Sequence, residues 1–329
     1  MKKIGLFGTG HLGKIHAKCM KESEIIALVG VYDVDYECAV RVAEEFETIA
    51  YRNPQELLEV CEIADIVTTT SAHYEMAKMA MQSGKDVFIE KPVTVTPEEA
   101  QDLLEIQKNK GIKVQVGHVE RFNPAFQAAK NIIHTPLFIE THRLALFNPR
   151  GNDVSVVLDL MIHDLDIVLK IVNSPLIDIQ ASGVAIVTDS FDIANVRLHF
   201  ASGCVANLTA SRISLKNMRK TRIFQDNAYI GVDFLEKKCE VIHIENVPDE
   251  TQNPFAMILD TGDGKPKKQI KIDSPNILMN NAIQSELESF VHAVEQDLIP
   301  EVTLSDGMKV LQVAYAVLEK INKTIPIVK

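Results

Sequence analysis

The chain has 329 residues, 46% of them hydrophobic, and a formal net charge of −11 at pH 7. This length is typical of two domains, and the acidic balance argues against nucleic acid or an anionic membrane surface as the main partner. No apolar run approaches the roughly 20 residues that a membrane-spanning helix needs. The five cysteines are spread without a Cys-x-x-Cys pair, which indicates neither a zinc site nor a redox pair. We therefore expect a cytoplasmic protein with reduced thiols.

Short apolar runs alternate with helical patterns from the N-terminus to about residue 116. The runs that predict strands are 4–8, 26–32, 66–69, 86–89 and 113–116. Helical patterns lie between them at 12–20, 35–46, 54–60, 73–82 and 96–110. Alternation at this spacing is typical of parallel strands joined by crossover helices. Residues 1–120 are therefore predicted to form a doubly wound α/β domain.

The first turn of this domain is the glycine-rich stretch 8–13, which reads Gly-Thr-Gly-His-Leu-Gly. Its first glycine permits a tight turn, its second lets a pyrophosphate approach the backbone, and its third lets the helix pack on the strand. The following helix start offers N–H groups and a positive dipole end to an anion. Asp33 ends the next apolar run and is placed to accept hydrogen bonds from a ribose. The combination predicts dinucleotide binding; the alternative is an ordinary turn with a surface aspartate.

The second half of the chain has a different pattern. Helical patterns continue at about 124–134 and 153–172. Strand-like runs follow at 177–187, 194–200, 204–211, 219–225, 228–233 and 240–245. They predict a mainly antiparallel sheet in hairpin order. A loop-rich stretch at 249–268 and helices at about 281–296 and 304–322 complete an α+β domain, which we expect to span residues 121–329.

Two motifs point to chemistry. Glu90-Lys91-Pro92 follows a predicted parallel strand, at the edge where ligands of such sheets gather, so Lys91 could reach a substrate hydroxyl or the nicotinamide ribose. Asp159 and His163 are four residues apart on a helical pattern, so they share one face and could form a general acid/base pair. The alternatives are a charged surface turn and a capped or buried histidine. Metal binding by His163 with neighbouring aspartates has little support from the spacing.

Other candidate residues have weaker signals. His73 and the hydroxyl groups of Thr69, Thr70 and Ser71 could touch a ribose or phosphate, or simply cap a helix. Arg121 and Asn123 fall where the two domains should meet. The basic run 212–222, which includes Arg212, could receive a diphosphate; the alternative is a solvated hairpin.

In this order the motifs resemble those of the glucose–fructose oxidoreductase and inositol dehydrogenase family, often written Gfo/Idh/MocA, over essentially the full length. The likeness rests on the 8–13 turn with His16 behind it, His73, the segment 84–92, the segment 121–124, Asp159 with His163, and Ser285-Glu286-Leu287 with Phe290. Two positions depart from the family pattern. Met161 stands where the family often has glycine, and Thr69-Thr70 stands where it often has Thr-Pro.

The resemblance implies a Rossmann domain, a second domain with a large open sheet whose face forms homodimers or homotetramers, and a tightly held nicotinamide dinucleotide. We expect NAD, with NADP as the alternative, because the charge of Asp33 opposes a 2′-phosphate. The expected catalytic residues are Lys91, His163 and Asp159. The expected cofactor contacts are Gly8, Gly10, His11, Leu12, Gly13, Asp33, Thr70, His73, Glu90 and Lys91. The expected substrate contacts are Lys91, Arg121, Asn123, His163 and Arg212, and no metal ligand is expected.

Within the family, the stretches 116–124 and 207–212 look most like the branch of UDP-N-acetylglucosamine 3-dehydrogenases. This likeness implies hydride transfer between the nicotinamide and a secondary carbon of a sugar nucleotide. Two alternatives stay open. One is a dehydrogenase of a free sugar or inositol, which a solvent-facing basic run would favour. The other is a non-enzymatic regulator that binds the dinucleotide, which retention of the catalytic set argues against.

Overall fold

A computed structural model describes residues 1–148, 154–247, 257–260, 262 and 265–324. The chain forms two compact units, the first from Met1–Phe122 with Asn281–Val313 and the second from Asn123–Asn280 with Ala314–Lys329. The predicted second domain, residues 121–329, includes Asn281–Val313, whereas in the structure this stretch belongs to the first unit.

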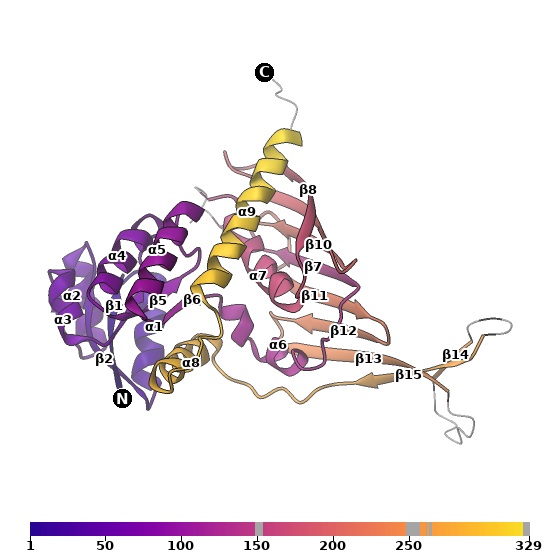
Figure 1. Cartoon of the computed structure of the whole chain (residues 1–329), viewed down its shortest axis with the longest axis horizontal. Helices are drawn as coiled ribbons and strands as arrows, with labels where there is room; N and C mark the ends of the chain where they lie inside the picture. Colours follow the sequence, from indigo (N-terminus) through magenta and orange to yellow (C-terminus); the bar gives the residue numbers. More distant parts are fainter. Residues whose placement is uncertain (149–153, 248–256, 261, 263–264, 325–329) are drawn as a thin grey trace. The chain divides into compact units, whose positions relative to one another are not determined.

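The first unit is built on a six-stranded sheet with the order β3-β2-β1-β4-β5-β6, in which every paired strand is parallel. Its strands are β1 Lys2–Phe7, β2 Ile26–Tyr32, β3 Ala50–Tyr51, β4 Ile63–Ile66, β5 Asp86–Glu90 and β6 Val114–Gly117. The connecting helices are α1 His11–Glu22, α2 Tyr36–Glu45, α3 Pro54–Val60, α4 Thr70–Gln82 and α5 Pro97–Lys110 (Figure 1). The prediction of a doubly wound parallel sheet is confirmed.

Two details of this sheet differ from the prediction. Strand β3 is only two residues long and has no pattern of its own. Strand β4 begins at Ile63, three residues earlier than expected. The prediction missed this start because the buried carboxylate of Asp65 interrupts the apolar run. The order of the strands reverses between β1 and β4. In open parallel sheets, ligands bind at such a reversal, beyond the carboxyl ends of the strands.

The second unit is built on a nine-stranded sheet with the order β14-β15-β13-β12-β11-β7-β10-β9-β8. Its longer strands are β7 Phe138–Leu144, β8 Leu176–Val184, β9 Ile193–Phe200, β10 Val205–Ser211, β11 Met218–Gln225, β12 Ala228–Asp233 and β13 Lys238–Asn246. Two shorter strands are β14 Met257–Leu259 and β15 Lys268–Asp273, so the stretch 249–268, expected to be loop-rich, contains a strand. All pairs are antiparallel except β7 with β10.

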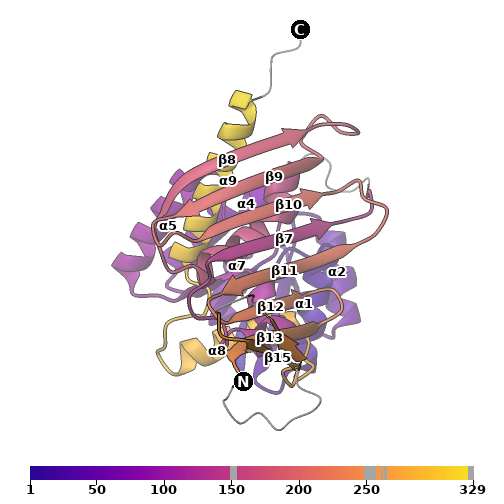
Figure 2. The same cartoon turned by 90° about the vertical axis from the view of Figure 1, so that its right-hand side faces the viewer.

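Strand β7 breaks the expected hairpin order, because it lies between β10 and β11. Its sequence gave no clear strand signal, since Thr141 and Arg143 stand on its buried side where apolar residues are usual. Helices α6 Pro124–Ala129 and α7 Ile162–Ile171 contact strands of this sheet. On the opposite face the described residues form no helix (Figure 2), and this face displays polar pairs such as Arg222 with Glu140 at 2.7 Å.

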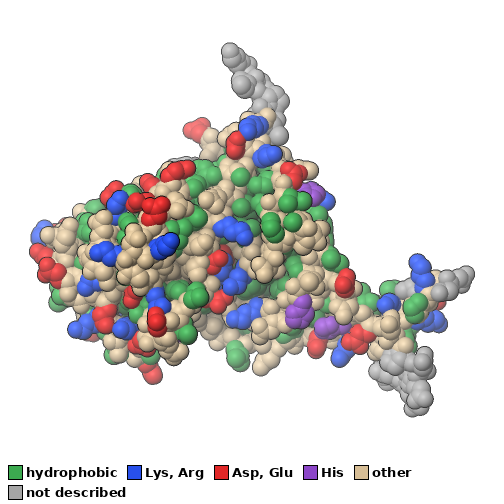
Figure 3. Space-filling view, viewed as in Figure 1, with side chains coloured by type: hydrophobic (Ala, Val, Ile, Leu, Met, Phe, Trp, Pro, Cys, Tyr) green, Lys and Arg blue, Asp and Glu red, His purple; other side chains and the backbone are tan. Residues whose placement is uncertain are grey.

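Two helices near the C-terminus are α8 Ala282–Glu295 and α9 Leu304–Thr324. Helix α8 packs against α1 and the 3-10 turn η1 Val119–Phe122 within the first unit. Acidic and basic side chains are interspersed over the visible face of each unit (Figure 3). Among the described helices, none is long and apolar enough to span a bilayer.

Candidate functional site

The glycine turn between β1 and α1 has the geometry that its sequence predicts. Gly8 has a φ of +103°, and a Cβ there would lie 2.6 Å from the Val67 carbonyl. A Cβ on Gly13 would lie 2.1 Å from the Gly8 oxygen, whereas a Cβ on Gly10 would meet nothing within 4 Å. The fold therefore requires the first and third glycines. The second borders open space, which is where a pyrophosphate needs to approach the backbone.

The two helices that start at the strand reversal have no side-chain caps. Gly10 before α1 has no side chain, and the Thr69 side chain before α4 accepts no capping hydrogen bond, whereas α2, α3 and α5 are capped by Asp35, Asn53 and Thr96. The Thr69 hydroxyl instead lies 3.1 Å from that of Ser71. The first-turn N–H groups of α1 and α4 thus suit an anionic ligand.

The predicted residues His11, Leu12 and Thr70 all lie in these first turns. His11 is exposed, Leu12 packs partly against the core, and Thr70 is half-buried at the start of α4. The fit to a dinucleotide phosphate therefore comes mainly from backbone groups.

Asp33 follows β2 and is fixed beside the glycine turn. Its Oδ2 accepts hydrogen bonds from the Thr9 N–H at 2.7 Å and the Thr9 hydroxyl at 2.9 Å, and its Oδ1 accepts one from the Asp35 N–H at 3.0 Å. An ionised carboxylate has about four acceptor positions, so one position remains for a ribose hydroxyl. Thr9 is a supporting residue that the sequence motif did not single out.

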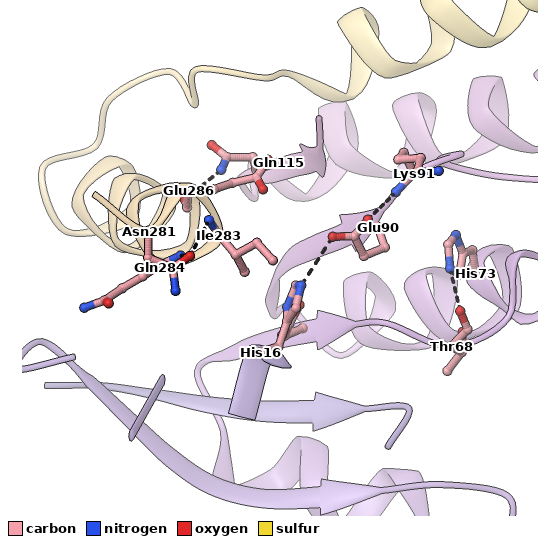
Figure 4. A network of polar contacts seen from close by, with 11 residues as sticks. His16, Thr68, His73, Glu90, Lys91, Gln115, Asn281, Ile283, Gln284 and Glu286 are labelled. Carbon is pink, nitrogen blue, oxygen red and sulfur yellow. Dashed lines mark hydrogen bonds and ion pairs between the residues drawn. The ribbon is translucent and has the colours of Figure 1, made fainter. Parts of the chain in front are cut away.

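Strand β5 ends in the Glu90-Lys91-Pro92 turn, whose Lys91–Pro92 peptide bond is cis. The Glu90 carboxylate turns back into the domain, where its Oε2 accepts a hydrogen bond from the Lys91 N–H at 3.0 Å (Figure 4). Its Oε1 lies 3.3 Å from Nε2 of the buried His16. Glu90 therefore fixes the backbone of Lys91, whereas the prediction made Glu90 a cofactor contact.

His73 on α4 ties two segments of the first unit together. Its Nδ1 lies 2.8 Å from the Pro92 carbonyl oxygen. Its Nε2 lies 3.1 Å from the Thr68 carbonyl oxygen (Figure 4). Burial lowers the pKa of His73 below its ordinary value. Because both ring nitrogens face backbone carbonyls, this geometry does not support direct cofactor contact, and His73 instead holds the turn that carries Lys91.

Asp159 and His163 occupy adjoining turns of different kinds in the second unit. Asp159 lies in the π-helical turn η2 Val157–Met161, and His163 lies in the first turn of α7. The prediction placed both on one regular helix from 153 to 172, of which residue 153 lies outside the described residues. π-turns are rare and occur frequently at functional sites. Met161, in the family's glycine position, is fully buried in this turn.

The two aspartates after His163, Asp164 and Asp166, are buried within the second unit. Asp164 forms a buried two-pronged ion pair with Arg143, with nitrogen–oxygen distances of 3.0 Å in both arms. Asp166 is fully buried. Within the described residues, no group of three or more His, Cys, Asp or Glu side chains is arranged to hold a metal ion.

Arg121 and Asn123 were predicted to contact substrate, and the structure gives both another role. The Arg121 side chain is only 2% exposed, and its Nη1 donates to the Glu301 carbonyl at 3.0 Å and to Asp306 at 3.3 Å. Asn123 caps α6 through the Ala125 N–H and donates to the Phe234 carbonyl. Both side chains are buried in contacts within their own unit, so we leave them out of the proposed substrate site.

Replacing Arg121 with methionine should therefore affect stability rather than substrate binding. The loss of hydrogen bonds from a buried guanidinium is expected to lower the free energy of unfolding by about 1–3 kcal/mol. Denaturant unfolding and KM measured on the same preparation check this expectation. A raised KM with unchanged stability would contradict it.

The basic run 212–222 does not form one site. Lys220 and Arg222 are exposed on the helix-free face of the sheet and pair with Asp233 and Glu140. Arg212 is 5% exposed, and its Nη2 donates to the Val154 carbonyl. Its Nε and Nη1 have no hydrogen-bond partner among the described residues. Since Val154 lies three residues before η2, Arg212 supports the segment that leads to Asp159.

Two residues that the sequence reading missed complete the arrangement behind Lys91. Asp65 on β4 accepts from Nδ1 of His16 at 2.9 Å. Gly117 at the end of β6 makes room for the Glu90 carboxylate, because a Cβ there would lie 2.7 Å from Oε1. The only sequence signal for Asp65 was a carboxylate inside an apolar run, where a buried charge requires a partner.

Known proteins match both halves of the chain. Residues 2–118 match the family described as "Oxidoreductase family, NAD-binding Rossmann fold", and residues 141–230 match the "GFO/IDH/MocA C-terminal domain". The chain is 35% identical over 298 residues to UDP-N-acetylglucosamine 3-dehydrogenase of Acidithiobacillus ferrooxidans, a match that covers 89% of this chain and 88% of that protein. It is 31% identical over 232 residues to scyllo-inositol 2-dehydrogenase (NAD(+)) of Bacillus subtilis, covering 64% and 68%.

Solved structures give the same result. UDP-N-acetylglucosamine 3-dehydrogenase GnnA from A. ferrooxidans superposes with a TM-score of 0.87 at 32% identity, over 98% of both chains. Levoglucosan dehydrogenase in complex with NADH and levoglucosan superposes with a TM-score of 0.82 at 18% identity, covering 98% of this chain and 97% of that one. At this lower identity the likeness establishes the fold alone.

Proposed function

The chain belongs to the GFO/IDH/MocA family of NAD-binding oxidoreductases, and from this membership we propose that it oxidises C3 of a UDP-N-acetylhexosamine. The observation that carries the proposal is the match of 35% identity across nearly the whole of a UDP-N-acetylglucosamine 3-dehydrogenase. The match covers 89% of this chain, so it extends over both units.

The residues of the first unit fit the cofactor. In this proposal the 8–13 turn and the first turn of α1 hold the pyrophosphate, and the first turn of α4 from Thr70 adds N–H groups. Asp33 accepts a hydrogen bond from the adenosine ribose, and Lys91 contacts the nicotinamide ribose. Bound NAD supplies a hydride acceptor at its nicotinamide C4.

Lys91 and His163 are the proposed catalytic residues. The Lys91 ammonium stabilises the alkoxide that develops on the sugar, and the His163 imidazole accepts the hydroxyl proton as hydride leaves the same carbon. Asp159 orients His163 and favours its protonated form. General acid–base catalysis of this kind typically contributes about 10²–10⁴-fold. Arg212 supports the Asp159 turn, rather than serving as the direct substrate contact expected from the sequence.

A second candidate function is oxidation of a free polyol. Lys220 and Arg222 are exposed and paired with acidic side chains, so these two residues of the run 212–222 do not offer the diphosphate site that a sugar nucleotide would need. One of the relatives is scyllo-inositol 2-dehydrogenase (NAD(+)). A panel of UDP-N-acetylglucosamine, its uronic acid, UDP-glucose, glucose and myo-inositol separates the two, with reduced nicotinamide absorbance as the readout. Turnover of the acetamido sugar nucleotides alone supports the proposal, and turnover of free polyols alone contradicts it.

Asp33 should make the enzyme prefer NAD over NADP. A 2′-phosphate would face a carboxylate that already holds Thr9, and this like-charge contact opposes binding. We expect Asp33→Ala to narrow the difference between the dissociation constants for the two cofactors. Isothermal titration of both variants with both cofactors checks this, and a wild-type preference for NADP would contradict it.

We further propose that the protein is a cytoplasmic homodimer or homotetramer. The helix-free face of the nine-stranded sheet is the surface that supports this assembly (Figure 2). Light scattering of the purified protein measures the oligomer size, and a monomer at all concentrations would contradict it.

A further inference from the structure

His16 is a buried histidine that the proposed reaction does not use. It lies on α1 with a fully buried side chain and has a carboxylate at each ring nitrogen. Nδ1 is 2.9 Å from Oδ2 of Asp65 on β4, and Nε2 is 3.3 Å from Oε1 of Glu90 on β5. The second contact is an ion pair rather than a well-aligned hydrogen bond.

The charges around His16 indicate an imidazolium. An ionised carboxylate has no proton to donate and repels a nitrogen lone pair, so a carboxylate facing each ring nitrogen favours a proton on both. Burial opposes this charge, but Asp65 and Glu90 outweigh it and raise the pKa of His16 well above its ordinary value. The pKa of Glu90 is lowered because its contact with His16 outweighs its burial, whereas burial raises the pKa of Asp65. The Cys19 thiol, one turn along α1, also lies in the field of His16.

The arrangement leads directly to Lys91. Glu90 faces His16 with one oxygen and holds the Lys91 N–H with the other, at 3.0 Å (Figure 4). Apolar side chains of similar volume usually stabilise a core as well as a buried ion pair does. Three buried ionisable groups therefore give no stability that apolar side chains would not give. What they do add is a fixed position for the backbone of Lys91.

We propose that His16 is a positioning residue, which acts through Glu90 to hold the Lys91 backbone where the lysine side chain meets the substrate hydroxyl. This inference rests on the catalytic role proposed for Lys91. It predicts that contact with Glu90, rather than contact with Asp65 or the bulk of the ring, determines the effect of His16 on turnover.

Two amide substitutions separate these contacts. The amide nitrogen of glutamine can occupy the place of Nε2 and donate to Glu90, whereas that of asparagine reaches only the place of Nδ1 beside Asp65. We expect His16→Asn to lower kcat by roughly ten- to a hundredfold, as misplacement of a catalytic group does, with little change in the dissociation constant for NAD. His16→Gln should retain most of the kcat.

Hydrogen–deuterium exchange measures the Lys91 amide without any need for activity. Pro92 has no amide, so short peptides across the turn isolate the Lys91 signal. We expect this amide to exchange faster in His16→Asn and to stay protected in His16→Gln. Equal protection in the two variants, or equal loss of kcat, would overturn the inference. Full activity of Lys91→Ala would contradict the proposed function instead, and the exchange difference would still decide the role of His16.

If the single variants fail to fold, the same pair is compared in an Asp65→Asn background. That background leaves one buried carboxylate instead of two beside the amide. The same difference in kcat and Lys91 exchange between the two double variants is expected, and its absence would overturn the inference.

Discussion

Alanine in place of Lys91 or His163 should lower turnover severely and leave NAD binding nearly intact. Lys91→Ala removes the cation that stabilises the alkoxide, and His163→Ala removes the group that accepts the hydroxyl proton. Each loss is expected to lower kcat by about 10²–10⁴-fold. The pyrophosphate is held by backbone groups of the glycine turn and α1, which neither substitution touches, so loss of the one proposed Lys91 contact with the nicotinamide ribose should raise the dissociation constant for NAD only slightly.

Steady-state kinetics with UDP-N-acetylglucosamine and titration with NAD check these expectations. His134→Ala is a suitable control in the second unit, because the His134 side chain is exposed and its backbone N–H, which alanine keeps, donates to Gln225 Oε1 at 3.1 Å. This control should keep wild-type kcat. Near-full activity of both Lys91→Ala and His163→Ala would show that the catalytic assignment is wrong.

Alanine at Gly10 and at Gly13 should have opposite consequences. Gly10 has φ −65° and ψ −166°, which alanine adopts readily, and its added Cβ meets nothing within 4 Å. Gly10→Ala should therefore keep or slightly raise the free energy of unfolding, by up to about 1 kcal/mol. It should weaken NAD binding by roughly tenfold or more, about 1.4 kcal/mol, because the methyl group occupies the pyrophosphate approach.

Gly13→Ala places a methyl group 2.1 Å from the Gly8 oxygen, so the backbone must shift. Overpacking of this kind typically costs about 1–3 kcal/mol, and this variant should lose stability before cofactor is added. Thermal unfolding with and without NAD measures both effects. If Gly10→Ala binds NAD as the wild type does, the pyrophosphate does not lie against this turn.

The sheet and the candidate cofactor residues of the first unit could be predicted because each motif is a short stretch of consecutive residues. The glycine turn, Asp33 and the Glu90-Lys91-Pro92 turn each follow directly from a strand, and parallel strands bring their carboxyl ends to one edge. The strand that was misplaced, β4, contains Asp65, whose charge is acceptable in the core only because His16 lies beside it. That partner is 49 residues away in sequence, and no periodicity reveals it.

The second unit was less predictable for a related reason. Strand β7 carries Arg143 on its buried side, and the charge is balanced by Asp164 on α7. Polar pairs of this kind form between distant segments. They place charged residues on the buried side of a strand, so the strand lacks the apolar alternation that would predict it. Arg121 also has distant partners: a charged residue near a domain junction suggested a ligand, whereas the observed contacts of Arg121 are with Glu301 and Asp306, far along the chain.

The most direct test of the proposed function follows a labelled hydrogen from the sugar to the cofactor. UDP-N-acetylglucosamine with deuterium at C3 is incubated with the enzyme and NAD, and the reduced cofactor is isolated for mass spectrometry and NMR. We predict that deuterium appears at the nicotinamide C4 and that the sugar becomes the 3-keto product. Reduced cofactor without deuterium would place the oxidation at another carbon, and no reduced cofactor from this substrate, with NAD bound, would contradict the proposed substrate.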